Sequence, residues 1–129
     1  MEIGNISEVF ERNLDDDEGV LFAYLHGSYA VGEETGMSDL DIAVFTKHGF
    51  GLKERARLSR KLSAELGRET DISVLNNAST AFRHQVLKKG ELIYSRDRDQ
   101  RIRFEEEVYR KYLDMKPFME KFNEVRRSA

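Results

Sequence analysis

Two aspartates separated by one residue, Asp39 and Asp41, stand at the start of an apolar run in this chain. In an extended segment, residues i and i+2 project from the same face, so both carboxylates point to one side while Leu40 and Ile42 point into a core on the other. Carboxylates about 7 Å apart at their Cα atoms can converge on one divalent cation or bridge two ions roughly 4 Å apart. The pair therefore predicts a metal site at the beginning of a strand.

A glycine–serine pair, Gly27-Ser28, ends the preceding apolar run, which begins at Leu21. Glycine allows the backbone to approach a ligand closely or to adopt a positive φ. The amides of Ser28 and Tyr29, at the opening of a helical turn, would point at an anion such as a phosphate. A phosphate-binding turn next to metal-binding carboxylates predicts a site for a metal–nucleotide complex.

A third carboxylate, Asp71, lies in a later segment, residues 69–75, that we expect to be a strand. If this strand lies beside the strand of Asp39 and Asp41, Asp71 joins them as a third acidic ligand. Strand register cannot be read from the sequence, because a shift of one residue turns every side chain to the opposite face. From the residues alone, a strand-edge aspartate with no role in the site remains the alternative.

The rest of the chain supplies helices and strands that would position these residues. Gly67 and Gly90 are expected to end helices, and Ser7 and Ser79 to cap them. We therefore predict an α/β (α+β) fold with a small mixed β-sheet and helices packed on it. The predicted helices cover residues 6–14, 52–66 and 79–89, and the predicted strands cover residues 20–25, 40–46, 69–75 and 92–94.

The C-terminal region is predicted to contain a charged connection over residues 96–103 and a last helix from about Gln100 to Asp114, which Pro117 ends or kinks. Beyond it, the apolar residues of the tail, Phe118, Met119 and Phe122, lie on one side. Such a stripe is usually core or a docking face, and a terminal stripe on a small domain favours docking. We expect a single domain, residues 1–129, whose last part, about residues 100–129, docks a partner.

Length and composition exclude several classes of protein. A chain of 129 residues holds one core but no separate substrate-binding domain. Its 21 Lys+Arg against 24 Asp+Glu give a net charge of −3, which argues against a surface for nucleic acid. Without cysteine, it has neither disulfides nor a thiolate zinc site. No apolar run approaches the roughly 18 residues that span a bilayer, so we expect a soluble cytoplasmic protein without membrane contact.

The spacing Gly27-Ser28, ten residues, Asp39-x-Asp41 resembles the signature of the nucleotidyltransferase superfamily of DNA polymerase β type, in its smallest, stand-alone form. Later segments are similar to the minimal nucleotidyltransferase antitoxins of MntA type, which are encoded beside HEPN-domain toxins. These segments are Thr70-Asp71-Ile72, the stretch from Ala78 to Gly90, Leu92-x-Tyr94 and Tyr112-Leu113-Asp114. The resemblance covers nearly the whole chain after residue 20. Its first motif is specific for the superfamily, and the later segments carry the subfamily assignment.

The resemblance implies the polymerase β-type nucleotidyltransferase fold and a specific activity. It implies that Asp39, Asp41 and Asp71 are the catalytic residues and the ligands of Mg²⁺, with two ions expected, and that Gly27 and Ser28 bind the nucleotide. Proteins of this type transfer AMP from ATP to a tyrosine of the partner HEPN toxin and thereby neutralise it. A hydroxyl presented by a protein also suits a domain that has no evident groove for nucleic acid.

Two alternatives stay open. One is a nucleotidyltransferase that acts on a small molecule or an RNA end. The other is a non-catalytic antitoxin that neutralises its toxin by binding alone. Many relatives carry a basic residue where this chain has Val31, which keeps the second alternative open, although the three aspartates count against it. The sequence does not decide between a homodimer and a hetero-oligomer with the toxin.

Overall fold

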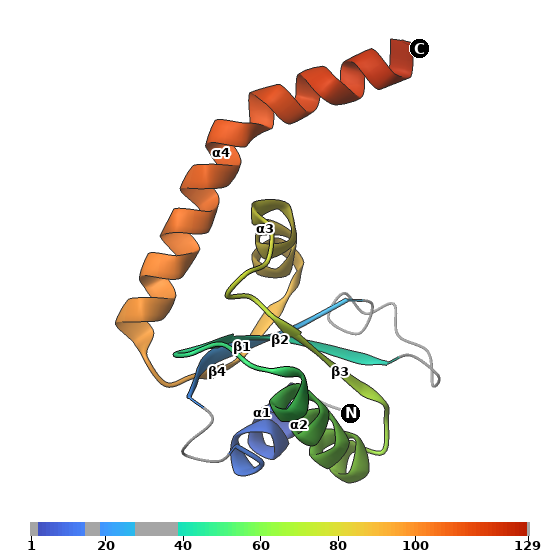
Figure 1. Cartoon of the computed structure of the whole chain (residues 1–129), viewed down its shortest axis with the longest axis vertical. Helices are drawn as coiled ribbons and strands as arrows, with labels where there is room; N and C mark the ends of the chain where they lie inside the picture. Colours follow the sequence, from blue (N-terminus) through green and yellow to red (C-terminus); the bar gives the residue numbers. More distant parts are fainter. Residues whose placement is uncertain (1–2, 15–18, 28–38, 129) are drawn as a thin grey trace.

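The computed structural model describes residues 3–14, 19–27 and 39–128, which form a four-stranded sheet between helices (Figure 1). The sheet order is β3-β2-β1-β4, with β1 antiparallel to β2 and β4, and β2 parallel to β3. The predicted mixed α/β fold is confirmed. The elements in chain order are α1 (Ile3–Arg12), β1 (Val20–His26), β2 (Leu40–Thr46), α2 (Leu52–Leu66), β3 (Thr70–Val74), α3 (Thr80–Lys89), β4 (Glu91–Ser95) and α4 (Arg98–Ser128).

Helices α1 and α2 cover one face of the sheet (Figure 1). Every second residue at the start of β2, namely Leu40, Ile42 and Val44, is fully buried under them. This alternation is the pattern expected of a strand that lies against a helix layer. The other members of this cluster include Ile6, Phe10, Leu58, Leu62 and Leu66 from the helices and Ala23, Leu25 and Ile72 from the sheet.

Helices α3 and α4 cover the opposite face, on which the alternate strand residues lie. Val86 of α3 and Phe104 and Val108 of α4 are buried there. The hydroxyl of Tyr24 in β1 donates a hydrogen bond of 2.8 Å to Glu105 Oε1 of α4. Burial, together with the neighbouring Glu105, raises the pKa of Tyr24, so the phenol keeps its proton at neutral pH. The N-terminal half of α4 is therefore fixed to the sheet by apolar packing and by a buried hydrogen bond.

Two of the predicted helix ends are confirmed in detail. Gly67 adopts φ +68° after α2, a left-handed conformation that favours glycine, and its N–H donates to the Ser63 carbonyl at 3.0 Å. Ser79 caps α3, because its Oγ accepts a hydrogen bond of 3.1 Å from the Phe82 amide. These signals fix where α2 ends and where α3 begins, and β3 lies between them.

The predicted helix cap at Ser7 is wrong. Helix α1 begins at Ile3, so Ser7 lies inside it, away from the free amides of the first turn that a cap would accept from. The Ser7 hydroxyl instead donates to the backbone carbonyl of Ile93 in β4. It ties α1 to the edge strand.

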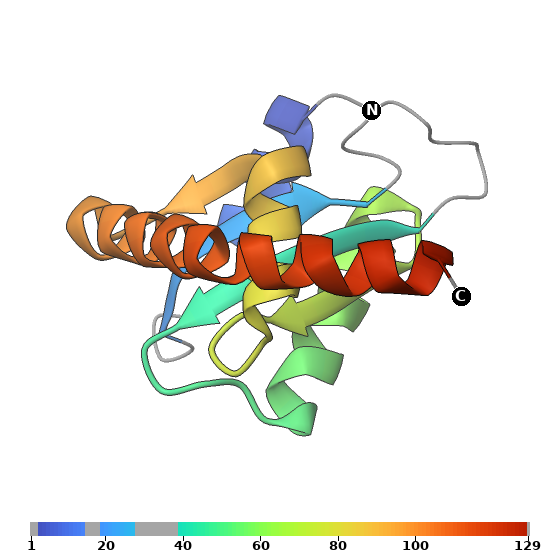
Figure 2. The same ribbon diagram turned by 90° about the horizontal axis from the view of Figure 1, so that it is seen from above.

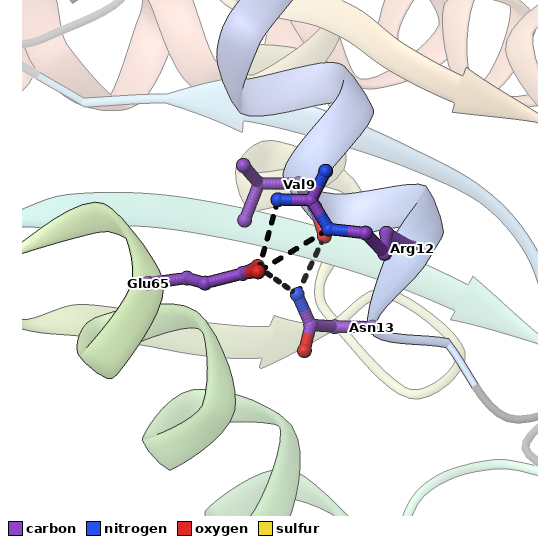
Figure 3. A network of polar contacts seen from close by, with 4 residues as sticks. All are labelled: Val9, Arg12, Asn13 and Glu65. Atoms are coloured by element: carbon purple, nitrogen blue, oxygen red, sulfur yellow. Dashed lines mark hydrogen bonds and ion pairs between the residues drawn. The ribbon is translucent and has the colours of Figure 1, made fainter.

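A polar network joins the end of α1 to α2 (Figure 3). Arg12 donates to Glu65 Oε1 from Nε at 3.2 Å and from Nη2 at 2.9 Å. Asn13 Nδ2 donates to Glu65 Oε2 at 2.5 Å and to the Val9 carbonyl at 2.8 Å. The hydrogen bonds from Asn13 and Arg12 lower the pKa of Glu65. Because the network is exposed to solvent, it orients the two helices more than it stabilises the fold.

The C-terminal helix differs from its predicted extent. Helix α4 begins at Arg98, inside the segment predicted to be a charged connection, and continues to Ser128. Asp97 is the signal that the prediction missed, since its Oδ1 accepts a hydrogen bond of 3.0 Å from the Gln100 amide as a cap does. Pro117 lies inside the helix and does not end it. The ribbon bends between its two halves instead (Figure 1), as expected where a proline removes a helical hydrogen bond.

At 31 residues, α4 has the length that crossing a bilayer would require. Among the described residues, however, no helix is both long and apolar enough to span a membrane.

Candidate active site

The predicted acidic residues meet at one edge of the sheet, where β1 ends and β2 and β3 begin. In the parallel pair, Asp41 of β2 is in register with Asp71 of β3. Asp39 precedes Asp41 by two residues and is exposed, as is Asp71, whereas Asp41 is partly buried. The condition set for Asp71, that its strand lie beside the strand of the other two, is therefore met.

Strand alternation shows to which side of the sheet these carboxylates belong. Ile42 and Ile72, which follow Asp41 and Asp71, are buried under α1 and α2. Neighbouring side chains on a strand point to opposite faces. Asp41 and Asp71 therefore lie on the face that α3 and α4 cover.

Asp41 lies close to two other carboxylates, Asp39 and Asp71, and their negative charges affect its pKa. Burial raises the pKa of Asp41, His26 opposes that rise, and the negative charges of Asp71 and Asp39 add to it. The negative charges around Asp41 repel one another, and a divalent cation bound between the carboxylates would relieve this repulsion. The donor set, hard carboxylate oxygens, is of the type that Mg²⁺ prefers.

The sequence prediction missed a residue of this edge, His26. It pairs directly with Asp41 across the antiparallel strands. Its ring contacts Phe82 of α3 edge-on, with centroids 5.6 Å apart, and its Nε2 is buried without a hydrogen-bond partner among the described residues. Burial lowers the pKa of His26 although Asp41 and Asp71 act in the opposite direction, so the imidazole is neutral at pH 7. Its place directly before Gly27, at the end of the apolar run, was the available signal.

The turn at Gly27 packs directly against Asp41. Gly27 has φ +79°, which is unfavourable for residues with a side chain. A Cβ at this position would overlap Oδ2 of Asp41 and lie 3.2 Å from its Cγ. Two features therefore favour glycine here: its positive φ, and the space that the Asp41 carboxylate occupies where a Cβ would lie.

Two predicted features lie outside the described residues. Ser28, the second residue of the predicted phosphate-binding turn, and Val31 both fall within residues 28–38. The nucleotide-binding role of Ser28 therefore stays a prediction.

Arg83 of α3 has a structural position. Its Nε donates to the Leu75 carbonyl at 2.8 Å and its Nη2 to the Asn76 carbonyl at 2.5 Å. The guanidinium carbon also lies 5.2 Å from the centre of the Phe104 ring. Arg83 therefore links α3 to the end of β3 and to α4.

Within residues 3–14, 19–27 and 39–128, no group of three or more His, Cys, Asp or Glu side chains is arranged so that it could hold a metal ion. Mg²⁺ keeps several waters and is usually held by one or two carboxylates plus substrate phosphates, so a site for this ion need not be complete in the protein alone. Asp39, Asp41 and Asp71 would then serve as the protein ligands of an ion that arrives with a nucleotide. An edge of this kind suits phosphoryl or nucleotidyl transfer.

Comparison with known proteins agrees with this chemistry. The family described as "Polymerase beta, Nucleotidyltransferase" matches residues 5–99. Protein adenylyltransferase MntA of Shewanella oneidensis is 30% identical over 95 residues, which cover 74% of this chain and 68% of MntA.

Two solved structures show the same fold. One is a toxin–antitoxin with AMP-PNP, with a TM-score of 0.77 and 23% identity over 97% of this chain and 98% of that one. The other is a tri-AMPylated Shewanella oneidensis HEPN toxin in complex with MNT antitoxin, with a TM-score of 0.75 and 22% identity over 96% of this chain and 98% of that one. The family match over most of the chain, together with the identity to MntA, shows that this protein belongs to the polymerase beta nucleotidyltransferase family.

Proposed function

We propose that this protein is an antitoxin that transfers AMP from ATP to a tyrosine hydroxyl of a partner HEPN-domain toxin. The observation that carries the proposal is the register of Asp41 with Asp71 beside the Gly27 turn. The name of the relative MntA, a protein adenylyltransferase, supports AMP as the group transferred. The solved complexes with AMP-PNP and with a tri-AMPylated HEPN toxin support ATP as the donor and such a toxin as the acceptor.

The residues of the sheet edge have distinct roles in this reaction. The acceptor oxygen attacks the α-phosphorus of ATP in line, a new P–O bond forms, and the bond to the leaving pyrophosphate breaks. Asp39, Asp41 and Asp71 would hold Mg²⁺, with two ions expected, and the bound metal would neutralise the charge that develops on the phosphates. Asp71 is exposed at the edge, where it can also accept the proton of the acceptor hydroxyl. Gly27 and Ser28 hold the outer phosphates.

The same proposal includes the place of action. A reaction that consumes ATP and neutralises a toxin made in the same cell belongs in the cytoplasm, where both are found. The protein would act there as a hetero-oligomer with its toxin.

A labelling experiment with two forms of ATP tests the transfer itself. The purified protein is incubated with its proposed HEPN-domain partner, Mg²⁺, and ATP labelled at either the α- or the γ-phosphate. We expect label on the HEPN protein from α-labelled ATP only, because nucleotidyl transfer releases the γ-phosphate with pyrophosphate.

The other outcomes identify the alternatives. Label from γ-labelled ATP would indicate a kinase. A tight complex without label from either form would indicate neutralisation by binding. Label that appears on a small molecule or an RNA end, with none on the HEPN protein, would indicate a different acceptor. Each of these results would contradict the proposed function.

A further inference from the structure

The C-terminal half of α4 is not part of the packed domain. The last described residue of α4 that is buried is Val108, and residues 113–125 are exposed except for the partly covered Met119. We call residues 113–125 the arm. Figure 1 shows the arm standing off the sheet on the side of α3, and Figure 2 shows it pointing toward the end of the sheet where β1 ends and β2 begins. The arm thus extends on the same face, and toward the same edge, as Asp41 and Asp71.

The arm carries an exposed apolar stripe. Its members follow one another at spacings of three, four and three residues, which places them on one face of the helix. Toward the N-terminus of α4, the same helix face carries Phe104 and Val108, which are buried in the domain. The stripe therefore continues the core-facing side of α4. The stripe consists of Met115, Phe118, Phe122 and Val125, of which Phe118 is 76% and Phe122 is 58% exposed.

The arm gains little stability from the rest of the domain. It continues the packed half of α4, but Pro117 removes one of its helical hydrogen bonds, and residues 113–125 bury no side chain that would offset the loss. Large aromatic side chains exposed in a row add the cost of apolar surface in water. A helix of this type is stabilised when a partner covers its apolar face.

A groove lies beside the beginning of the arm. It has a volume of about 230 Å³ and lies between α3 and α4, where Met119 and Tyr112 face His84 and Lys88. The rings of His84 and Tyr112 stack in parallel, 3.4 Å apart at their centroids, and join the two helices at this point.

The far end of the groove is basic and leads to the site. Lys88 and Lys89 line it and form the exposed last turn of α3. Gly90, the next residue, lies against β1: a Cβ there would be 2.9 Å from the Leu25 carbonyl oxygen and 3.5 Å from Cβ of His26. The surface is therefore apolar along the arm, basic in the groove and acidic at the catalytic edge.

We propose that the arm and the α3–α4 groove form the docking surface for the acceptor protein, which presents an amphipathic helix with apolar residues toward the arm and acidic residues toward Lys88 and Lys89. This inference rests on the proposed function, since it identifies how the acceptor of that reaction is held. The order of the three surfaces favours the acceptor over a second copy of this chain, because a partner lying along the arm and the groove reaches the carboxylate edge. Binding there places the acceptor hydroxyl at the edge and leaves the chemistry to the aspartates.

The test compares the stripe with an exposed apolar residue elsewhere on the domain. The double variant Phe118→Ala/Phe122→Ala truncates the stripe, and Leu52→Ala, which alters a residue 80% exposed at the start of α2 on the opposite face of the sheet, is the control. With the HEPN-domain protein as acceptor and saturating ATP, we expect the double variant to raise the KM for that protein at least about 10-fold while kcat changes less than about 2-fold. Lys88→Glu is expected to raise the same KM, and Leu52→Ala to leave it unchanged.

A binding measurement separates this proposal from the proposed function. The affinity for the HEPN protein is measured by calorimetry in the Asp41→Asn background, where no transfer is needed. At least about 10-fold weaker binding of the double variant would support the docking surface even if the wild-type protein transferred no AMP. Wild-type affinity in the double variant, or no binding by the parent protein, would overturn it. A third result would also overturn the proposal: the parent protein is a homodimer, and the double variant is a monomer that binds the HEPN protein with unchanged affinity. The stripe would then bind a second copy of this chain.

Discussion

Replacing Asp41 with asparagine is expected to reduce AMP transfer at least about 100-fold, because Asp41 is the carboxylate at the centre of the site. It lies in register with Asp71, opposite His26 and against the Gly27 turn. Asparagine has nearly the same shape but lacks the charge that a divalent cation requires. Initial rates of label incorporation from α-labelled ATP measure the effect. Asp99→Asn, which alters an exposed aspartate in the first turn of α4, serves as the matched control and should keep wild-type activity.

The same variant is expected to fold as well as the wild-type protein. Burial raises the pKa of Asp41 despite the opposing effect of His26, so its ionised form destabilises the folded state without metal. This cost is absent at low pH and appears as the pH rises through the raised pKa. In EDTA at pH 7, the melting temperature of Asp41→Asn should therefore equal or exceed that of the wild type. An active Asp41→Asn, or one inactive only because it is unfolded, would contradict the assigned role.

Replacing Gly27 with alanine is expected to lower both activity and stability. Alanine would have to adopt the positive φ of Gly27, which costs about 1 kcal/mol, and its Cβ would overlap Oδ2 of Asp41. Relief of that overlap has to move the carboxylate or the turn. Because displacements of about 1 Å at a catalytic group can cost about 100-fold in rate, we expect transfer to fall by about 10- to 100-fold.

Gly67→Ala is the matched control for this substitution. Gly67 also has a positive φ, +68°, but nothing lies within 4 Å of a Cβ placed there. Both variants should lose about 1 kcal/mol of unfolding free energy from the backbone, measured by denaturant titration. Only Gly27→Ala should also lose activity. Equal activities of the two variants would show that the contact between Gly27 and Asp41 has no importance for catalysis.

The sequence predicted best those elements whose ends carry a local signal. Strand β2 and helix α2 begin and end where predicted, since an apolar run bounded by Asp39 and a helical stripe stopped by Gly67 leave little freedom. The cap at Ser79 fixed the start of α3 in the same way. In each case the deciding contact is within a few residues of the signal.

Features that depend on residues far apart in the chain were not predictable. The pairing of Asp41 with Asp71 needs the parallel register of β2 and β3, for which the residues alone left an alternative. His26 became part of the site only once β1 paired antiparallel with β2. The alternation of apolar and polar residues does not indicate which strands are neighbours in the sheet. Both results therefore became visible only in the three-dimensional structure.

The extent of helix α4 was predicted wrongly for a different reason. Its first turn is charged, which is typical of a connecting segment, although Asp97 caps the helix there. Among its described residues, the second half buries no side chain that would have marked its inner face, and its proline suggested an end as readily as a bend. A helix that completes its packing on a partner leaves an incomplete pattern in its own sequence.

The most direct test of AMP transfer is the intact mass of the HEPN-domain protein after incubation with this protein, ATP and Mg²⁺, followed by peptide mapping. The account predicts a mass increase of one or more AMP units, located on tyrosine, with wild-type protein, and an unchanged mass with Asp41→Asn. An unmodified HEPN protein that both forms neutralise equally well would contradict the account and show that this nucleotidyltransferase fold acts by binding alone.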